Sequence, residues 1–155
     1  MSGRGHVLQI VFWFFLIVGL AGCSGGPTPI RVKGALETSP DLNPDFGGRP
    51  SPVVLRVYQL RSPDPFQNAD FFSLFDNELA TLGQNLISRD EFELQPGESR
   101  EYKTELDLAT KYIGVVAAFR DLENSRWRAL TKLPDKDKVR LQIKLESLAV
   151  SISAK

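Results

Sequence analysis

Histidine, cysteine and any excess of charge are nearly missing from this chain of 155 residues. It contains one Cys and one His, and its 19 basic side chains balance its 19 acidic ones. A lone Cys cannot close an internal disulfide, and it cannot hold zinc without several other ligands. A balanced charge argues against a nucleic-acid-binding protein, which usually gathers a basic excess on one face. The length suits a single domain.

The first residues have the pattern of a secretory leader. Arg4 precedes an apolar run over residues 7–20, in which Gln9 is the clear exception. The run is shorter than the roughly 20 residues of a membrane-spanning helix and fits the hydrophobic region of a signal peptide, about 7–15 residues. The sequence Leu20-Ala21-Gly22-Cys23 then resembles a bacterial lipobox. We predict a signal peptide over residues 1–22; the alternative is a short signal anchor with an incidental Cys.

Cys23 is the residue on which this interpretation depends. In the lipoprotein pathway its thiol receives a diacylglyceryl group, and the new amino terminus is acylated. Each buried CH₂ contributes roughly 0.8 kcal/mol and stable anchoring needs about two chains, so this lipid would hold the protein on a membrane. Ser24, in place of Asp, favours the periplasmic face of the outer membrane by analogy with known lipoprotein sorting.

Cleavage would also remove His6, the one His of the chain. With Cys23 acylated, the mature protein has neither an imidazole nor a free thiol, and no GxSxG or SxxK motif marks a nucleophile. A Ser–Lys or Ser–Asp arrangement stays open, as does a weak calcium site at Asp41 and Asp45. We expect no enzyme activity, no small-molecule substrate, no nucleic acid, no metal and no cofactor beyond the covalent lipid.

Alternation of apolar and polar residues predicts a mainly β domain over residues 30–155, joined to the lipid by a flexible tether at 23–29. About eight strands with short turns between them favour a two-layer antiparallel β-sandwich. The expected strands cover residues 30–37, 53–58, 91–95, 101–108, 112–119, 127–131 and two segments between 139 and 152. In the last two segments the apolar residues change from odd to even positions. Glu146-Ser147 must therefore be a turn or a bulge, and the sequence leaves both open.

One segment, at about 66–83, breaks the β pattern and predicts a short helical insert. Asp70 is placed to cap a helix, Gly83 fits its end, and Asp76-Asn77 is a point at which it can divide in two. The apolar residues of the expected helix face lie at helical spacing: Phe71, Phe75, Leu79 and Leu82. We expect this face to pack on the edge or end of the sandwich.

A group of basic residues precedes and begins the next-to-last predicted strand. Two Asp residues are interleaved with it, which is typical of a solvated hairpin turn. Contact with membrane headgroups or peptidoglycan is a second interpretation. The residues are Lys132, Asp135, Lys136, Asp137, Lys138 and Arg140.

The irregular segment from Ser39 to Ser51 is long for a loop without structure of its own, and such loops are usually functional or disordered. Prolines in the segment stiffen it and lower the entropy cost of being bound. It also carries Leu42 and Phe46, two apolar residues that a mere linker does not need. Partner binding is one interpretation; the other is that both side chains fold back onto the sandwich.

These features together resemble the type VI secretion lipoproteins of the TssJ (VasD) family. The resemblance runs from the lipobox nearly to the C-terminus, and it rests on the order and spacing of short motifs. The motifs are Asn43-Pro44-Asp45, Gly48-Arg49-Pro50-Ser51-Pro52, Arg56-Val57-Tyr58-Gln59-Leu60, Phe66, Asp70-Phe71-Phe72, Leu74, Leu82-Gly83, Pro96-Gly97-Glu98-Ser99, Tyr112, Gly114-Val115, Ala117, Phe119-Arg120-Asp121 and Trp127-Arg128.

The resemblance implies a transthyretin-like β-sandwich with a helical insert, carried by an outer-membrane lipoprotein. It also implies that the protein binds the periplasmic C-terminal region of TssM, the large inner-membrane component, and so tethers the trans-envelope complex to the outer membrane. In the family the loop between the first two strands makes this contact, and here that loop is the segment from Ser39 to Ser51. The candidate contact residues are Leu42, Asn43, Asp45, Phe46 and Arg49.

Two other functions remain as alternatives to this interpretation. One is an outer-membrane lipoprotein that acts as pilot or chaperone for another envelope secretion component. The other is a periplasmic hydrolase, against which the loss of His6 and the absence of a nucleophile motif both argue.

Overall fold

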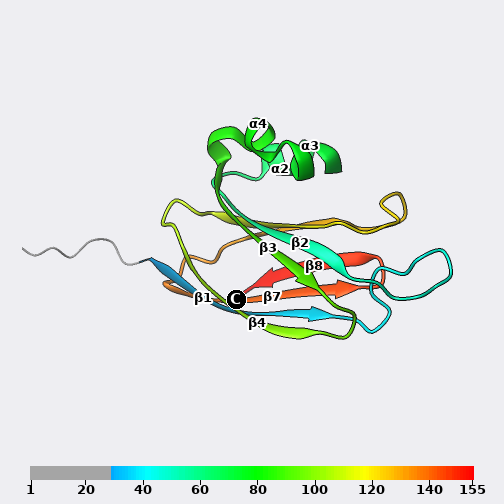
Figure 1. The fold of residues 1–155 in the computed structure, drawn as a ribbon. Helices are drawn as coiled ribbons and strands as arrows, with labels where there is room; N and C mark the ends of the chain where they lie inside the picture. The colour runs from blue at the N-terminus through cyan, green and yellow to red at the C-terminus, as the bar shows by residue number, and fades with distance from the viewer. Residues whose placement is uncertain (1–28) are drawn as a thin grey trace, which may run out of the picture.

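The computed structural model describes residues 29–155, which form two four-stranded sheets with short helices over one of them (Figure 1). The predicted leader and Cys23 lie outside the described residues. One sheet has the order β4-β1-β7-β8 and the other the order β3-β2-β5-β6. The strands are β1 (Ile30–Thr38), β2 (Val53–Leu60), β3 (Leu86–Leu94), β4 (Ser99–Leu106), β5 (Tyr112–Ala117), β6 (Arg128–Lys132), β7 (Lys138–Glu146) and β8 (Ala149–Ala154). The predicted two-layer β-sandwich is confirmed.

The strand pairings depart from the prediction at one place. Five of the six strand ladders are antiparallel, but β1 and β7 run parallel, with Val32 opposite Val139 and Leu36 opposite Ile143. Between β1 and β7 the chain crosses to the second sheet and back twice, and β7 enters the first sheet from the same end as β1. Alternation within a strand carries no information about this direction.

The main core lies between the two sheets, where the inward-facing residues of the strands meet. Strand β7 alternates strictly between exposed and buried positions over its nine residues. Strand β2 differs, because its second half is buried on both faces. Such a strand needs cover on its outer face as well.

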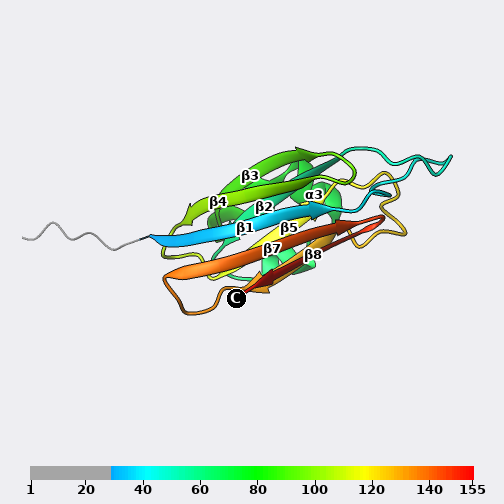
Figure 2. The same ribbon diagram turned by 90° about the horizontal axis from the view of Figure 1, so that it is seen from below.

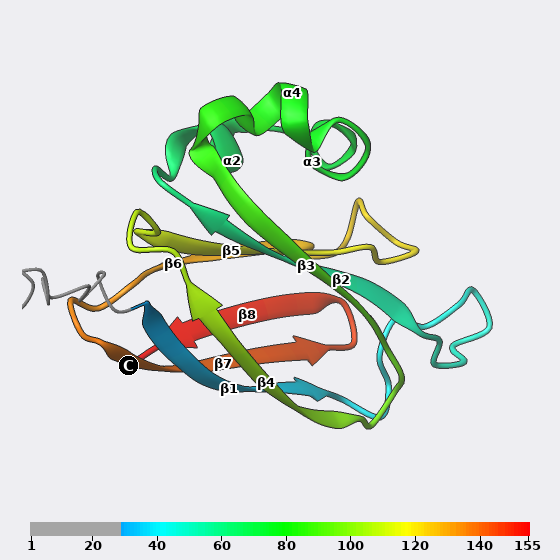
Figure 3. The same ribbon diagram turned by 60° about the vertical axis from the view of Figure 1, so that its left-hand side comes forward.

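The helical insert supplies that cover (Figure 3). It consists of α2 (Asp64–Asn68), α3 (Phe71–Asp76), α4 (Glu78–Leu82) and the 3-10 turn η1 (Gly83–Asn85). The insert packs on the outer face of the second sheet and not on its edge, which corrects the prediction. The buried residues of this second core are Tyr58, Leu60, Phe66, Leu74, Leu82 and Val116.

The local signals for the insert are confirmed in part. The Asp70 side chain accepts a hydrogen bond from the Ser73 N–H at 2.9 Å, and Asn77 divides the helix into α3 and α4. The predicted helix face is wrong at Leu79, which is 75% exposed, whereas Leu74 is fully buried. The break at Asn77 is the reason, because it resets the 3.6-residue period between the two helices.

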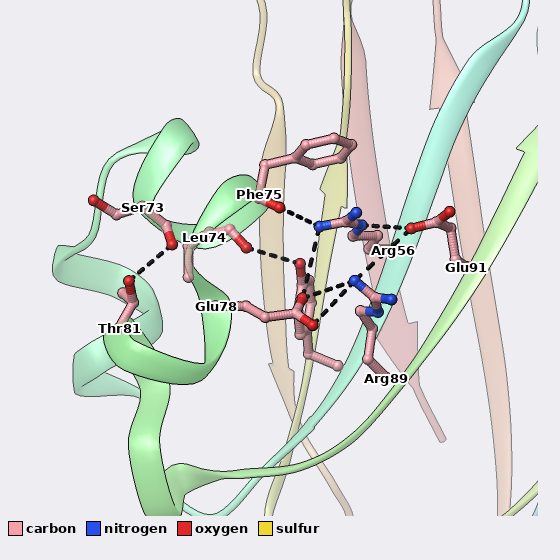
Figure 4. A network of polar contacts seen from close by, with 9 residues as sticks. Arg56, Ser73, Leu74, Phe75, Glu78, Thr81, Arg89 and Glu91 are labelled. Atoms are coloured by element: carbon pink, nitrogen blue, oxygen red, sulfur yellow. Dashed lines mark hydrogen bonds and ion pairs between the residues drawn. The ribbon is translucent and has the colours of Figure 1, made fainter.

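Arg56 on β2 ties the insert to the sheet from beneath (Figure 4). Its Nε donates a hydrogen bond to Glu91 at 2.7 Å, and its terminal nitrogen lies 3.6 Å from Glu78 and donates to the Phe75 carbonyl. Glu78 in turn lies 3.0 Å from Arg89. Each charge in this network has an opposite charge or a carbonyl beside it, as a partly buried charge requires.

The change of phase at Glu146-Ser147 is a turn. Glu146 pairs with Ala149, so Ser147 and Leu148 form a two-residue connection between β7 and β8. Neither residue has a positive φ, unlike the usual two-residue hairpin turns. Instead, the Ser147 carbonyl accepts from the Asn43 N–H at 2.8 Å and the Leu148 carbonyl from the Arg126 N–H at 2.8 Å. Neighbouring loops therefore hold the turn.

The two ends of the sandwich carry different connections. Strand β1 begins at one end, where the β6–β7 connection also lies, and leads into the β1–β2 loop at the opposite end (Figure 1, Figure 2). Its nine residues span about 30 Å at the usual rise of a strand. Within residues 29–155, none of the helices combines the length and the apolar character needed to cross a bilayer.

Candidate functional site

The β1–β2 loop meets the β5–β6 loop and the β7–β8 turn at one end of the sandwich (Figure 2). Leu42 at the base of the β1–β2 loop is fully buried in the main core. Its N–H donates to the Ser39 carbonyl at 3.2 Å, and its carbonyl accepts from the Ser51 N–H at 3.0 Å. The two ends of the loop are thus joined through Leu42.

Asn43 connects this loop to the β5–β6 loop. Its side chain is buried, its Nδ2 donates to the Pro52 carbonyl at 2.7 Å, and its Oδ1 accepts from the Arg120 N–H at 2.8 Å. Its φ of 48° lies in the left-handed region, which Asn tolerates better than most residues. The Arg120 Nε also donates to the Ser51 hydroxyl at 3.0 Å. Both loops therefore form one connected unit.

Asp45 shapes the tip of the loop. One carboxylate oxygen accepts from the N–H groups of Gly47 at 2.8 Å and Arg49 at 3.0 Å, and the other accepts from the Arg49 Nε at 2.9 Å. The Arg49 backbone N–H and then its guanidinium lower the pKa of Asp45 below its usual range. The Asp45 and Arg49 backbones are also paired, with the Asp45 N–H donating to the Arg49 carbonyl at 2.9 Å.

Phe46 lies at this tip with its side chain completely exposed to solvent. An apolar ring in that position gains nothing from the domain's own core. Beside it, an open groove with a volume of about 890 Å³ runs between the two loops. The groove is lined by Pro44, Asp45, Phe46, Arg120, Asp121, Leu122, Glu123, Asn124 and Leu148.

The structure separates the five candidate contact residues into three groups. Leu42 and Asn43 face inward and hold the loop, whereas Phe46 and Arg49 face solvent, and Asp45 is largely occupied by Arg49. Of the two apolar residues of the loop, one folds back onto the sandwich and the other does not.

Sequence reasoning missed the β5–β6 loop as part of this site. Arg120 and Asp121 lie 77 and more residues after Asn43, and no spacing or periodicity connects them. Asp121 holds its own loop by accepting from Asn124 Nδ2 at 3.0 Å. A local signal existed only for that turn, because Asp and Asn are frequent in turns.

Of the two carboxylates considered as calcium ligands, Asp45 is engaged by its own loop. It accepts hydrogen bonds from the backbone N–H groups of Gly47 and Arg49. Among the residues that the structure describes, no group of three or more His, Cys, Asp or Glu side chains is placed to hold a metal ion.

Two sheets, an insert over one of them and a stiff apolar-tipped loop at one end define a class of small β-sandwich domains. Residues 30–148 match the family of type VI secretion lipoproteins that includes VasD, EvfM and TssJ, and the chain belongs to this family. Among the curated proteins, none matches this sequence.

Solved structures agree with the family assignment. The T6SS lipoprotein TssJ1 from Pseudomonas aeruginosa is 41% identical, with a TM-score of 0.78 over 82% of this chain and 97% of that chain. Lip from Serratia marcescens, a membrane-bound component of the type VI secretion system, is 28% identical, with a TM-score of 0.74 over 79% and 96%. A chain in a structure of the T6SS protein TssM C-terminal domain from EAEC is 26% identical, with a TM-score of 0.65 over 79% and 97%.

Proposed function

We propose that this lipoprotein is anchored through acylated Cys23 on the periplasmic face of the outer membrane and binds the periplasmic C-terminal region of a TssM-like inner-membrane protein. It thereby tethers the trans-envelope complex to the outer membrane. Membership of the type VI secretion lipoproteins supports this proposal, as does the similar chain in the structure of a TssM C-terminal domain. We also propose that the role is structural, without catalysis, substrate or cofactor other than the lipid.

The observation that carries the proposal is the complete exposure of Phe46 on a loop that is already ordered. Burying a Phe side chain against a partner contributes about 1.5–3 kcal/mol. A loop fixed beforehand by Asp45 and Asn43 loses little conformational entropy on binding, so most of that gain remains as affinity. Arg49, exposed beside Phe46, offers a charge to the rim of the same contact.

The arrangement of the two ends supports a tethering role. Strand β1, which follows the predicted tether, begins at one end of the sandwich, and the β1–β2 loop that carries Phe46 lies at the other end, about one strand length away. A domain held by lipid at the first end would therefore present its loop away from the membrane, where a partner from the opposite membrane can reach it.

The partner contact can be tested by calorimetry with the purified TssM-like periplasmic region and the Phe46→Ser variant. We expect a loss of roughly 10- to 100-fold in affinity with an unchanged melting temperature, because Phe46 contributes nothing to the core. Phe72→Ser is the matched control, since Phe72 is 62% exposed on the helical insert, away from the loop. Equal affinities of Phe46→Ser and the unchanged protein would contradict the loop assignment.

Deletion of residues 42–49 is a poorer test than a point substitution. It would remove the buried Leu42 and the hydrogen bonds of Asn43, so the domain itself would lose stability. The anchor is tested separately by Cys23→Ser and membrane fractionation. We expect an unanchored protein and loss of secretion, and recovery of this variant in the outer membrane would rule out the lipid model.

A further inference from the structure

A row of basic side chains covers the outer face of the first sheet at the tether end. They come from the first residues of β1, the first residues of β7 and the last residue of the chain. All five are exposed, and they line a shallow groove between the strands. We refer to Arg31, Lys33, Lys138, Arg140 and Lys155 as the basic patch.

Like charges lie directly opposite one another within this patch. Lys33 pairs in register with Lys103 of β4 on one side and with Arg140 of β7 on the other. Cross-strand neighbours of equal charge destabilise a sheet. In the part of the chain that the structure describes, Arg31 contacts Glu105 at 3.9 Å and Lys103 contacts Glu101 at 2.7 Å, but Lys33, Lys138 and Arg140 have no ion pair. The fold itself gives no reason for this row of cations.

The basic patch lies close to the predicted lipid anchor, and this position gives a reason for its charge. The segment 23–29 can extend over at most about 25 Å, so lipid on Cys23 stays within that distance of Ile30. The patch begins one residue further along β1. The adjoining β6–β7 connection adds Lys136 together with Asp135 and Asp137, so the patch, this connection and Glu105 together carry six basic and three acidic side chains.

We propose that the basic patch binds anionic phospholipid headgroups of the membrane that holds the lipid anchor. The contact fixes the tilt of the sandwich on the bilayer and keeps the Phe46 end directed away from it. This proposal rests on the proposed lipid anchor for its location. Each basic residue near an anionic surface strengthens binding by roughly fivefold, and the tether raises the local concentration of that surface. The apolar Phe46 tip, at the other end, would not touch the bilayer.

The test uses the soluble domain, residues 24–155, without lipid. Both cores are built from residues between Ile30 and Ala154, so this part holds everything that the described fold requires. We expect it to sediment with vesicles of phosphatidylethanolamine and phosphatidylglycerol at low salt, to release at high salt, and not to bind phosphatidylcholine vesicles. Because neither the acyl chain nor TssM takes part, failure here is distinguishable from failure of the proposed function.

Lys33→Glu is the decisive variant. It reverses the central cation and gives Lys103 and Arg140 an acidic neighbour, so we expect vesicle affinity to fall about tenfold while the melting temperature stays equal or rises. Arg126→Glu is the matched control: it makes the same change of charge at an exposed position of the loop end, beside Leu148, and should bind vesicles as the unchanged domain does.

Three results would overturn the proposal. The first is an unchanged domain that does not sediment with anionic vesicles, and the second is equal vesicle affinity of Lys33→Glu and the unchanged domain. The third is binding to purified peptidoglycan without binding to vesicles, which would assign the patch to the cell wall.

Discussion

The guanidinium carbon of Arg56 lies 3.8 Å from the centre of the Phe75 ring, so that a strand cation is held between the helical insert and the sheet. The Arg56 side chain is only 13% exposed, and Glu78 and Glu91 compensate its charge. A cation that is desolvated over an aromatic ring gains more from it than an exposed one does.

Replacement of Arg56 by Ala should therefore weaken the insert. It removes the contact with the Phe75 ring and leaves Glu78 with Arg89 alone, and we expect a loss of about 2 kcal/mol in the free energy of unfolding, measured with urea. Lys103→Ala is the control, because its pair with Glu101 is exposed and should contribute less than about 0.5 kcal/mol. Equal stability of the two variants would show that the network does not hold the insert.

Asn43 should be a residue whose loss affects both stability and the order of the loop. Asn43→Ala removes two hydrogen bonds. It also places Ala, which tolerates the left-handed region less well than Asn does, at a φ of 48°. We expect the free energy of unfolding to fall by about 2–3 kcal/mol. Asn43→Gly removes the same hydrogen bonds but permits the backbone angle, and should lose about 1 kcal/mol less. Amide hydrogen exchange at Gly47 and Arg49 would report the loosened tip; unchanged exchange would contradict the idea that Asn43 holds it.

The tip should respond to acid at a pH below the ordinary titration of an aspartate. The pKa of Asp45 is lower in the folded protein than its usual value of 3.8, so its stabilising effect is complete above that value and is lost as the pH falls through the folded pKa. We expect the Gly47 and Arg49 amide signals in NMR to titrate together with a midpoint below 3.8. Arg49→Ala should move this midpoint only part of the way toward 3.8, because the backbone N–H at position 49 still donates to Asp45. A midpoint at or above 3.8 in the unchanged protein would contradict the hydrogen bonds seen here.

Gly114 on β5 should tolerate no side chain while Phe66 is present. A Cβ at this position would lie 2.7 Å from the Phe66 ring, which is itself buried. We expect Gly114→Ala to cost about 1–3 kcal/mol through overpacking. In the double variant with Phe66→Leu the cost of the added methyl group should largely disappear, since the smaller side chain vacates the space. Additive losses in a double-mutant cycle measured with urea would show that the two positions do not compete for it.

Some of the fold followed from residues close together in the sequence. Three features were predicted correctly because each depends on residues close together in the sequence. They are the strict alternation over β7, the Asp70 cap and the break at Asn77. The end of β4 was not predicted correctly: the alternation continued to Leu108, but the strand stops at Leu106. There the Asp107 carboxylate accepts from the Ala109 N–H and turns the chain.

The candidate site shows more clearly how far the sequence alone predicts structure. Composition and length marked the β1–β2 loop as unusual, but they gave no means of separating Leu42 from Phe46. The difference in burial between Leu42 and Phe46 depends on which side of the loop faces the core. The hydrogen bond between Asn43 and Arg120, 77 residues apart, holds the loop in the observed orientation. In an irregular segment no period connects sequence position to direction, so burial there cannot be deduced from pattern.

The sequence by itself determined the alternating strands, and it predicts the leader and the attachment residue Cys23, because each of these is a property of neighbouring residues. Tertiary structure alone decided that β1 and β7 run parallel, and so that Lys33 stands between Lys103 and Arg140. It also decided that the start of β1 and the β1–β2 loop, which carries Phe46, lie at opposite ends of the sandwich. These relationships join residues as far as 107 positions apart, such as Lys33 and Arg140, and only the packing of two sheets around a common core brings them into register.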